Sequence, residues 1–415
     1  MAANRRAELL RLLTTAAELE HSLTCQYLFA AFSLKHDTSE GLTDEQVNAV
    51  VEWERLILMV ARQEMEHLGL VVNLLTALGG APWLGHPRFP YSTHLFGHQM
   101  ALERFSIPTL EKFVCFERPE DVGPVDAFCK APPQDGATAQ PYTTVGELYE
   151  RVKSTLVAAA REDSDLFIGP PAAQVVGGML GTDFPRLGAM GGGYDIFLRS
   201  VTDLPSALAA IDLVIEQGEG TPHDGEVSHY RRFLDILHAV ESADPPFEAA
   251  RAVVANPVLG QPIGLEPGTV VTNADARAVM ELFDDAYRTM LMLLTRLFAH
   301  TDETENDLAV LRSVAFFPLM TMAVRPLGEV LTSLPAHDPD DGLRAGPSFD
   351  AGGPIAFLPH REAAWKVLEE ALRDLADRAT QLAKTAGMPE RLGYIAHSLD
   401  LIARRFAAGV GIGAA

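Results

Sequence analysis

Residues 61–75 read ARQEMEHLGLVVNLL, and this stretch decides the predicted fold. Glu64 and His67 are three residues apart, so on a helix both side chains lie on one face. Apolar residues recur around them at alternating three- and four-residue steps, as in a helix buried in a bundle. Burying a carboxylate and an imidazole in an apolar core is costly without a compensating partner. In helix bundles a metal ion held by Glu-x-x-His pairs is such a partner.

The preceding part of the chain has the same apolar spacing. It predicts a first helix at about residues 7–34, in which Glu20 is the charged residue of the apolar face. A second helix is predicted at about 43–79, with Thr43 as its N-cap in a capping box. The two helices are expected to form an antiparallel pair, in which Glu20 and Glu64 face each other near the middle.

Two further bundle helices are predicted at about 204–217 and 225–241. Glu226 and His229 repeat the Glu-x-x-His spacing at the start of the second of these. The end of the preceding helix supplies one more carboxylate, either from Glu216 or from Glu219. Glu216 is the preferred candidate, and the choice between the two stays open.

The segment between the two helix pairs, residues 86–200, is expected to be an irregular insert that includes one or two helices near 145–160. After a proline-rich linker, residues 243–415 are expected to form a separate C-terminal helical unit. Its helices are predicted at about 274–300, 307–334, 359–386 and 389–406. Pro318 and Pro326 are expected to kink or split the second of them. The predicted division is therefore 1–242, the metal-binding domain, and 243–415.

The inward-facing groups match a known pattern for binding two metals, with one carboxylate from each of two helices and a Glu-x-x-His from each of the others. The predicted metal ligands are Glu20, Glu64, His67, Glu216, Glu226 and His229. Carboxylates and imidazoles suit iron, with manganese as the alternative, and leave positions where dioxygen or a substrate binds. Tyr27 lies two steps from Glu20 on the apolar face. It is the candidate catalytic residue, as a redox or hydrogen-bonding neighbour, and a buried structural tyrosine is the alternative.

Composition narrows the classes of function. Hydrophobic residues make up 47% of the 415 residues, which is typical of a globular chain. The formal charge of −23 argues against a nucleic-acid or anionic-membrane partner. The three cysteines have no CxxC spacing, which favours a reducing compartment and disfavours a zinc or disulfide framework. The sequence shows neither a signal peptide nor an uncharged apolar run of about 18 residues, so the expected location is the cytoplasm.

Five motifs carry a family resemblance: AAELEHSLTCQYLFAAFSLK, VARQEMEHLGLVVNLLTALGGAP, FERPED, AIDLVIEQGEG and SHYRRF. Over roughly residues 8–240 they resemble the ferritin-like domain of the iminophenyl-pyruvate dimer synthases of violacein- and rebeccamycin-type pathways. The resemblance implies an all-α, ferritin-like four-helix bundle and the oxidative coupling of two imine units derived from aromatic amino acids. The residues that it places at matching metal-ligand positions are Glu20, Glu64, His67, Glu216 and His229.

The leading hypothesis is an oxygen-dependent, ferritin-like di-iron oxidase or oxygenase of secondary metabolism. Its expected partners are dioxygen and a small, amino-acid-derived substrate, together with a homo-oligomer or a biosynthetic partner enzyme. The alternatives are a non-enzymatic iron-handling protein and a scaffold partner of a biosynthetic complex.

Overall fold

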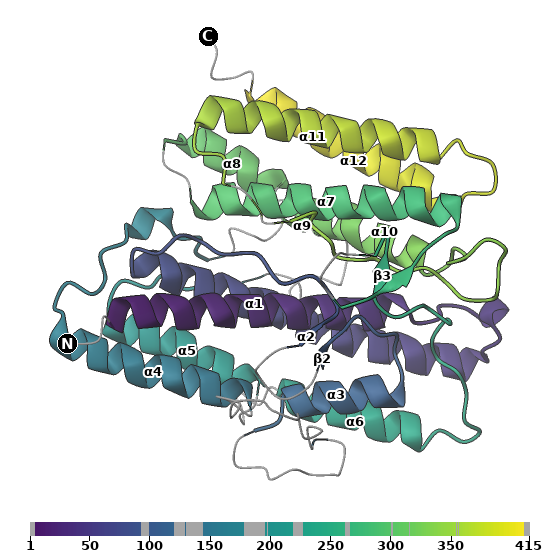
Figure 1. Ribbon diagram of the computed structural model, residues 1–415, viewed down its shortest axis with the longest axis horizontal. Helices are drawn as coiled ribbons and strands as arrows, with labels where there is room; N and C mark the ends of the chain where they lie inside the picture. The colour runs from purple at the N-terminus through teal and green to yellow at the C-terminus, as the bar shows by residue number, and fades with distance from the viewer. Residues whose placement is uncertain are drawn as a thin grey trace. The chain divides into compact units, whose positions relative to one another are not determined.

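The computed structural model describes residues 5–92, 99–119, 129, 144–177, 196, 198–218, 227–261, 266–299, 302–314, 316–353, 355 and 357–410 (Figure 1). The chain forms two compact units. The first comprises residues 1–81, 90–174 and 199–251, and the second comprises 82–89, 175–198 and 252–415. Both are built from helices, so the predicted all-α class is confirmed. The division into a domain of residues 1–242 and a domain of residues 243–415 stays a prediction.

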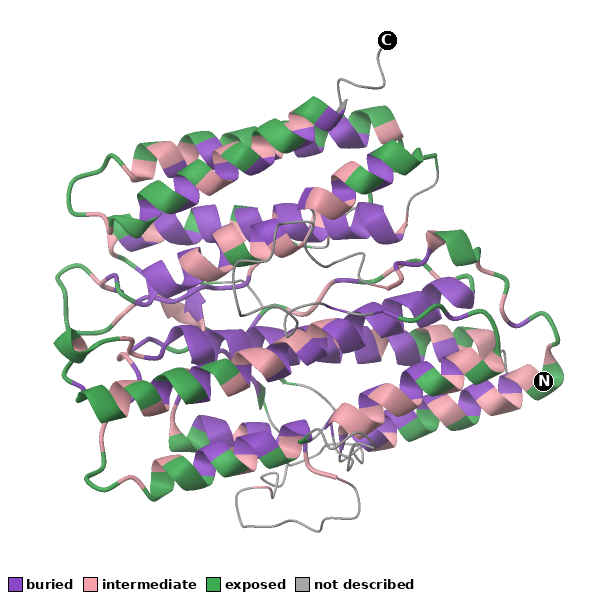
Figure 2. Ribbon diagram, turned by 180° about the vertical axis from the view of Figure 1, so that it is seen from behind, coloured by how far each residue is buried: buried purple, intermediate pink, exposed green. Residues whose placement is uncertain are grey.

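The first unit is built on two long helices, α1 (Arg5–Phe32) and α2 (Asp44–Ala77), which pack against each other. Thr43 and Gln46 form the predicted capping box, because each side chain bonds the backbone N–H of the other residue. Residues 19–32 of α1 are all buried. Figure 2 colours the structure by burial, and the α1–α2 pair is mostly buried there. The shorter helices of this unit therefore pack against the α1–α2 pair.

Four shorter helices complete the bundle: α3 (Ile107–Phe116), α4 (Val145–Glu162), α5 (Leu204–Gly218) and α6 (His229–Glu241). In Figure 1, α4 and α5 lie along one half of the α1–α2 pair, and α3 and α6 lie along the other half. The helix α4 packs against α1 and α5, and α3 packs against α6. Part of the expected insert, 86–200, thus belongs to the bundle. The expectation of an irregular segment is wrong for α3.

Side-chain caps fix where three of these helices begin. The hydroxyl groups of Ser106, Thr144 and Ser228 accept hydrogen bonds from backbone N–H groups in the first turns of α3, α4 and α6. Two short strands of the same unit, β1 (Tyr91–Ser92) and β2 (Gln99–Met100), pair antiparallel. The described part of this unit also contains the 3-10 turns η1 (Thr38–Glu40) and η3 (Pro171–Ala173).

The second unit contains the helices α7 (Ala274–Phe298), α8 (Glu305–Val314), α9 (Phe317–Leu319), α10 (Arg325–Leu331), α11 (Arg361–Leu382) and α12 (Arg391–Val410). The strands β3 (Pro257–Val258) and β4 (Thr269–Val270) pair in parallel. A π-helical turn, η5 (Met320–Val324), joins α9 to α10. Pro318 lies in α9 and Pro326 lies in α10. The predicted helix at 307–334 is therefore split where its prolines remove backbone donors.

One stretch of this unit, Glu305–Leu331, is long and apolar enough to cross a membrane by length and composition alone. Within its most apolar 18-residue window, 53% is buried inside the structure, and a core helix meets the same criteria.

Cys115 of α3 and Cys129 form a disulfide, with a Cα–Cα distance of 5.4 Å. The two residues are 14 positions apart in the sequence, a spacing that no short cysteine motif has. The third cysteine, Cys25, is a buried thiol. The cysteine pattern predicted no disulfide framework, and the fold corrects this for one pair, because residues distant in the sequence meet at the end of α3.

Candidate metal centre

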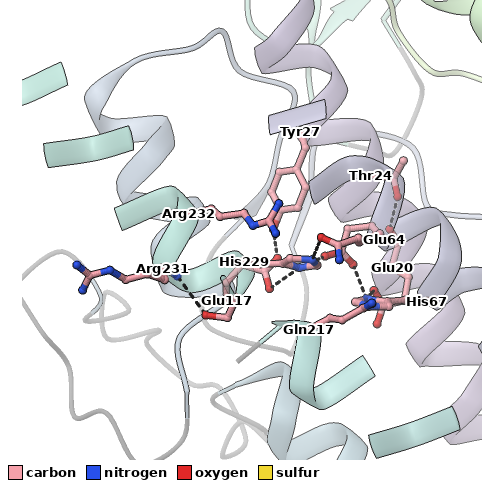
Figure 3. A network of polar contacts seen from close by, with 12 residues as sticks. Glu20, Thr24, Tyr27, Glu64, His67, Glu117, Gln217, His229, Arg231 and Arg232 are labelled. Carbon is pink, nitrogen blue, oxygen red and sulfur yellow. Dashed lines mark hydrogen bonds and ion pairs between the residues drawn. The ribbon is translucent and has the colours of Figure 1, made fainter. Parts of the chain in front are cut away.

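Five buried side chains from four segments converge inside the first unit (Figure 3). Glu20 comes from α1, Glu64 and His67 from α2, Glu117 follows the last residue of α3, and His229 is the first residue of α6. All five are at most 2% exposed. Their ligand atoms form two groups, in each of which the atoms lie within 4.8 Å of one another, and Glu64 belongs to both.

Glu64 directs one carboxylate oxygen at each histidine. Its Oε1 is 2.7 Å from Nδ1 of His229, and its Oε2 is 3.2 Å from Nδ1 of His67. Each histidine also faces a second carboxylate: Oε2 of Glu20 is 3.6 Å from Nδ1 of His67, and Oε2 of Glu117 is 3.5 Å from Nδ1 of His229. The centre therefore consists of two half-sites that share Glu64, which has the geometry of a bridging carboxylate.

The two carboxylates that belong to only one half-site, Glu20 and Glu117, each accept a hydrogen bond from a tyrosine through Oε1. The hydroxyl group of Tyr149, from α4, donates to Oε1 of Glu20 over 2.5 Å. The hydroxyl group of Tyr27 donates to Oε1 of Glu117. Each tyrosine thus leaves only Oε2 of its carboxylate for the half-site, which favours coordination through a single oxygen.

Burial and mutual charge set the protonation of the metal-free centre. Burial, reinforced by the nearby charge of Glu64, raises the pKa of Glu20 to about 8. The same two causes raise the pKa of Glu117. Burial opposes the ionisation of Glu64, but His67 and His229 outweigh it and hold the pKa of this carboxyl well below its usual value. Burial also disfavours the charged histidines, yet the carboxylates raise the pKa of both.

The donor set fits a pair of divalent metal ions. Oε2 of Glu20 and Nδ1 of His229 are buried atoms without a hydrogen-bond partner of normal geometry, although each points into its half-site. Buried polar atoms are rarely left in that state, and one bound ion in each half-site would account for them. Each half-site offers one imidazole nitrogen and two carboxylate oxygens, a mixture that suits iron or manganese.

An apolar cavity opens onto the centre. It has a volume of about 10 Å³, enough for about one water molecule, and four of the five ligand residues line it. Its remaining lining comes from Leu23, Val145, Gly146, Tyr149, Val214, Ile215 and Gly218. Most of these belong to the start of α4 and the end of α5, so the ends of the short helices make room beside the ligands.

The structure brings together most of the side chains that the sequence singled out. Glu20, Glu64, His67 and His229 meet as predicted, and Tyr27 contacts the centre through Glu117. Whether these residues bind metal, and whether Tyr27 is catalytic, stays a prediction.

Glu216 requires a correction. It is half-buried on α5 and belongs to neither group of ligand atoms among the described residues. The side chain of the next residue, Gln217, reaches His67 instead, with Oε1 at 2.8 Å from Nε2. Neighbouring residues of a helix point about 100° apart, so Glu216 and Gln217 lie on different sides of α5. Glu219 and Glu226 lie outside the described residues.

The sequence reasoning missed Glu117 and Tyr149. Glu117 belongs to the FERPED motif of the resemblance, and it continues the apolar positions Leu110, Phe113 and Val114 at helical spacing. The combination of this motif with a periodic apolar face is the signal that could have identified Glu117. Tyr149 lies on the buried face of α4 beside Leu148, and no local pattern indicates the partner of its hydroxyl group.

Comparisons with known proteins agree with this architecture. The sequence profile of the ferritin-like family matches residues 13–238, more than half of the chain. A dichlorochromopyrrolate synthase of Lentzea aerocolonigenes is 29% identical, over 97% of this chain and 41% of its own length. A 2-imino-3-(indol-3-yl)propanoate dimerase of Chromobacterium violaceum is 29% identical, over 93% of this chain and 37% of its own length. The chain thus spans about two fifths of the length of these curated relatives.

A solved structure of a ferritin-like protein from Caulobacter vibrioides aligns with 83% of this chain and 99% of its own, at a TM-score of 0.47 and 18% identity. The names of the two curated relatives confirm the resemblance to dimer-forming synthases that the motifs indicated. On the profile match and the helical bundle, the chain belongs to the ferritin-like family.

Proposed function

We propose that this protein is an oxygen-dependent di-metal oxidase or oxygenase of secondary metabolism, with two iron ions in its centre and manganese as the alternative metal. The observation that carries the proposal is the pair of half-sites that share Glu64 beside an apolar cavity. Its substrate is a small metabolite derived from an amino acid, in line with the names of the synthase and the dimerase. Both relatives are much longer chains, and this chain spans about two fifths of their length.

Each part of the centre has a role in this proposal. Glu20, His67 and Glu64 would hold one metal, and Glu117, His229 and Glu64 would hold the second. When bound, two iron ions supply the electron-transfer steps by which dioxygen oxidises an organic substrate. The apolar lining of the cavity excludes bulk water from the metal ligands, and its volume of about 10 Å³ leaves room for one small molecule such as dioxygen.

The tyrosines keep a hydroxyl proton next to the centre. Burial and the nearby carboxylates raise the pKa of Tyr27 and of Tyr149 well above its usual value, so both remain phenols that donate hydrogen bonds. Tyr27, through Glu117, is therefore proposed to provide a proton or a redox-active ring at the second half-site. We further propose a second copy or a biosynthetic enzyme as the macromolecular partner.

Metal stoichiometry is the first test. We expect about two irons per chain after anaerobic reconstitution with ferrous iron, measured by elemental analysis of the desalted protein. Oxygen uptake is then recorded with a panel of imines derived from aromatic amino acids. Two bound irons without oxygen uptake for any member of the panel would refute the oxidase, and no bound iron would refute the centre itself.

An iron-handling protein is the rival function, because the same ligands take up and oxidise iron. Assembly size separates the two, since iron storage needs a large closed shell. A discrete small assembly that consumes oxygen only when an organic substrate is present supports the oxidase. If the protein is instead a scaffold of a biosynthetic complex and its centre has no catalytic role, Glu64→Ala should leave the product yield of that complex unchanged.

A further inference from the structure

The two histidines of the centre make the same unusual pair of contacts. Each directs Nδ1 at the shared carboxylate of Glu64 and directs Nε2 at the side-chain oxygen of a glutamine. Nε2 of His67 is 2.8 Å from Oε1 of Gln217, and Nε2 of His229 is 3.2 Å from Oε1 of Gln63. The two imidazole rings are stacked, with their centroids 5.4 Å apart and an angle of 28° between the planes.

The glutamines connect different segments of the bundle. Gln217 lies in the last turn of α5 and contacts a histidine of α2. Gln63 lies on α2 and contacts the first residue of α6. The two hydrogen bonds thus connect the end of α5 and the beginning of α6 to α2. One of them involves the histidine of the first half-site, and the other involves the histidine of the second.

A hydrogen bond to an amide oxygen decides which imidazole nitrogen carries the proton. A neutral imidazole has one N–H donor and one nitrogen with a free lone pair. An amide oxygen is only an acceptor, so it stabilises the tautomer in which Nε2 carries the hydrogen. The lone pair of Nδ1 is then left facing the carboxylates, as binding to a metal requires.

We infer that Gln217 and Gln63 are positioning residues, each of which holds one histidine as the Nε2–H tautomer so that its Nδ1 is available to one metal. This inference rests on the proposed metal centre. Because an amide is neutral, the pair orients the rings without adding negative charge to a centre that already contains three carboxyl groups. Each glutamine serves its own half-site, so removal of one should affect one metal only.

Methionine substitutions test the two contacts, because methionine has nearly the length of glutamine but no comparable acceptor oxygen. We expect Gln217→Met to weaken the binding of one zinc ion about 10- to 100-fold and leave the other unchanged. We expect Gln63→Met to do the same at the opposite half-site. Zinc is the probe because it is diamagnetic, and its binding is measured by competition with a chelator of known affinity.

The tautomer gives a readout that a general structural role does not produce. In the zinc-loaded protein with 15N-labelled histidine, we expect both His67 and His229 to show a protonated Nε2 and a metal-bound Nδ1 by NMR. Gln217→Met should change the signals of His67 only, and Gln63→Met those of His229 only. Gln217→Glu keeps an acceptor oxygen, so it should retain affinity within a factor of about three.

A buried glutamine of the same unit provides the control. Gln174 bonds the backbone of Val201 through both of its side-chain groups, and Gln174→Met should leave zinc affinity unchanged. If the unaltered protein binds no metal, the proposed function fails and the inference fails with it. If it binds two zinc ions and both methionine variants match it in affinity and in NMR signals, the inference is overturned while the centre stands. Equal losses in Gln217→Glu and Gln217→Met would also overturn it.

Discussion

The hydroxyl group of Tyr149 donates a hydrogen bond to Oε1 of Glu20, although 129 positions separate the two residues in the sequence. Tyr27 makes the equivalent bond to Glu117 on the other side of the centre. The two tyrosines come from α4 and α1, and both are fully buried. In both Glu20 and Glu117, Oε1 therefore accepts a hydrogen bond from a tyrosine, and Oε2 faces a histidine.

Tyr149→Phe removes one hydroxyl group and keeps the ring. We expect the free energy of unfolding of the metal-free protein to fall by about 1–3 kcal/mol, because Oε1 of Glu20 loses its buried partner. Urea denaturation followed by circular dichroism measures this change. Tyr394→Phe is the matched control, since that ring is 76% exposed and its change should be near zero. Equal stability of both variants would show that the bond to Glu20 contributes nothing.

Tyr27→Phe tests the predicted catalytic role. The ring packs against Phe113 and Phe233, with centroids 4.6 and 4.8 Å away, so phenylalanine preserves that packing. We expect two irons per chain, as in the unaltered protein, and substrate oxidation slowed by about 100-fold because the proton beside Glu117 is lost. Iron content and oxygen uptake are measured on the same sample. A variant that oxidises substrate at the normal rate would make Tyr27 a structural residue.

Glu117 and Glu216 make opposite predictions about the ligand set. We expect Glu117→Ala to reduce the metal content from about two ions per chain to about one, because the half-site of His229 loses its unshared carboxylate. Glu216→Ala should keep both ions, since Glu216 belongs to neither group of ligand atoms. Elemental analysis after reconstitution decides between them. Loss of metal from Glu216→Ala alone would restore the assignment made from the sequence.

Three of the four predicted ligand residues that the structure brings together, Glu20, Glu64 and His67, lie on long, regular helices. Glu20 and Glu64 interrupt apolar faces that extend over many turns of α1 and α2, so their inward direction follows from periodicity. Glu117 follows a helix of only 10 residues. So few turns show little periodicity, and the surrounding prolines suggested a loop.

The error at Glu216 has a different physical cause. Gln217, and not Glu216, reaches His67, and the two differ by a rotation of about 100° on a helix with a broad apolar face. Spacing alone does not settle such a rotation near a helix end. The contacts between distant segments, such as Tyr149 with Glu20 and Cys115 with Cys129, depend on tertiary packing and had no local signal.

Gly218 controls the space beside the ligands. A Cβ atom at this position would lie 3.5 Å from Oε2 of Glu117, which is an ordinary contact, so Gly218→Ala should behave like the unaltered protein. Gly218→Leu should slow oxygen uptake about tenfold, because a cavity of about 10 Å³ cannot hold the longer side chain without displacing Glu117. Metal analysis and oxygen uptake with substrate test both variants. A leucine variant with normal oxygen uptake would mean that dioxygen and the substrate do not approach the centre through this cavity.

The second unit contains a separate acid-sensitive contact. Asp307, in α8, accepts hydrogen bonds from Nη2 and Nε of Arg361 at 2.6 and 3.0 Å, and from the backbone of Thr304 at 2.7 Å. Burial opposes its ionisation, but Arg361 and Thr304 outweigh it, so the pKa of Asp307 lies below its ordinary value of 3.8. The unfolded chain therefore takes up a proton at this carboxyl first as the pH falls. The stabilisation is complete above the ordinary pKa and is lost as the pH falls through the lower, folded value.

Asp307→Asn should lower the free energy of unfolding by about 2 kcal/mol at neutral pH, because the charged hydrogen bonds to Arg361 are lost. The difference from the unaltered protein should shrink below about pH 4, where the native carboxyl also becomes protonated. Urea denaturation between about pH 3 and pH 7 measures both effects. Asp400→Asn removes an exposed ion pair with Arg404 and should change stability by less than about 0.5 kcal/mol at any pH. A difference between Asp307→Asn and the unaltered protein that stays constant down to acidic pH would show that this carboxyl is not responsible for the loss.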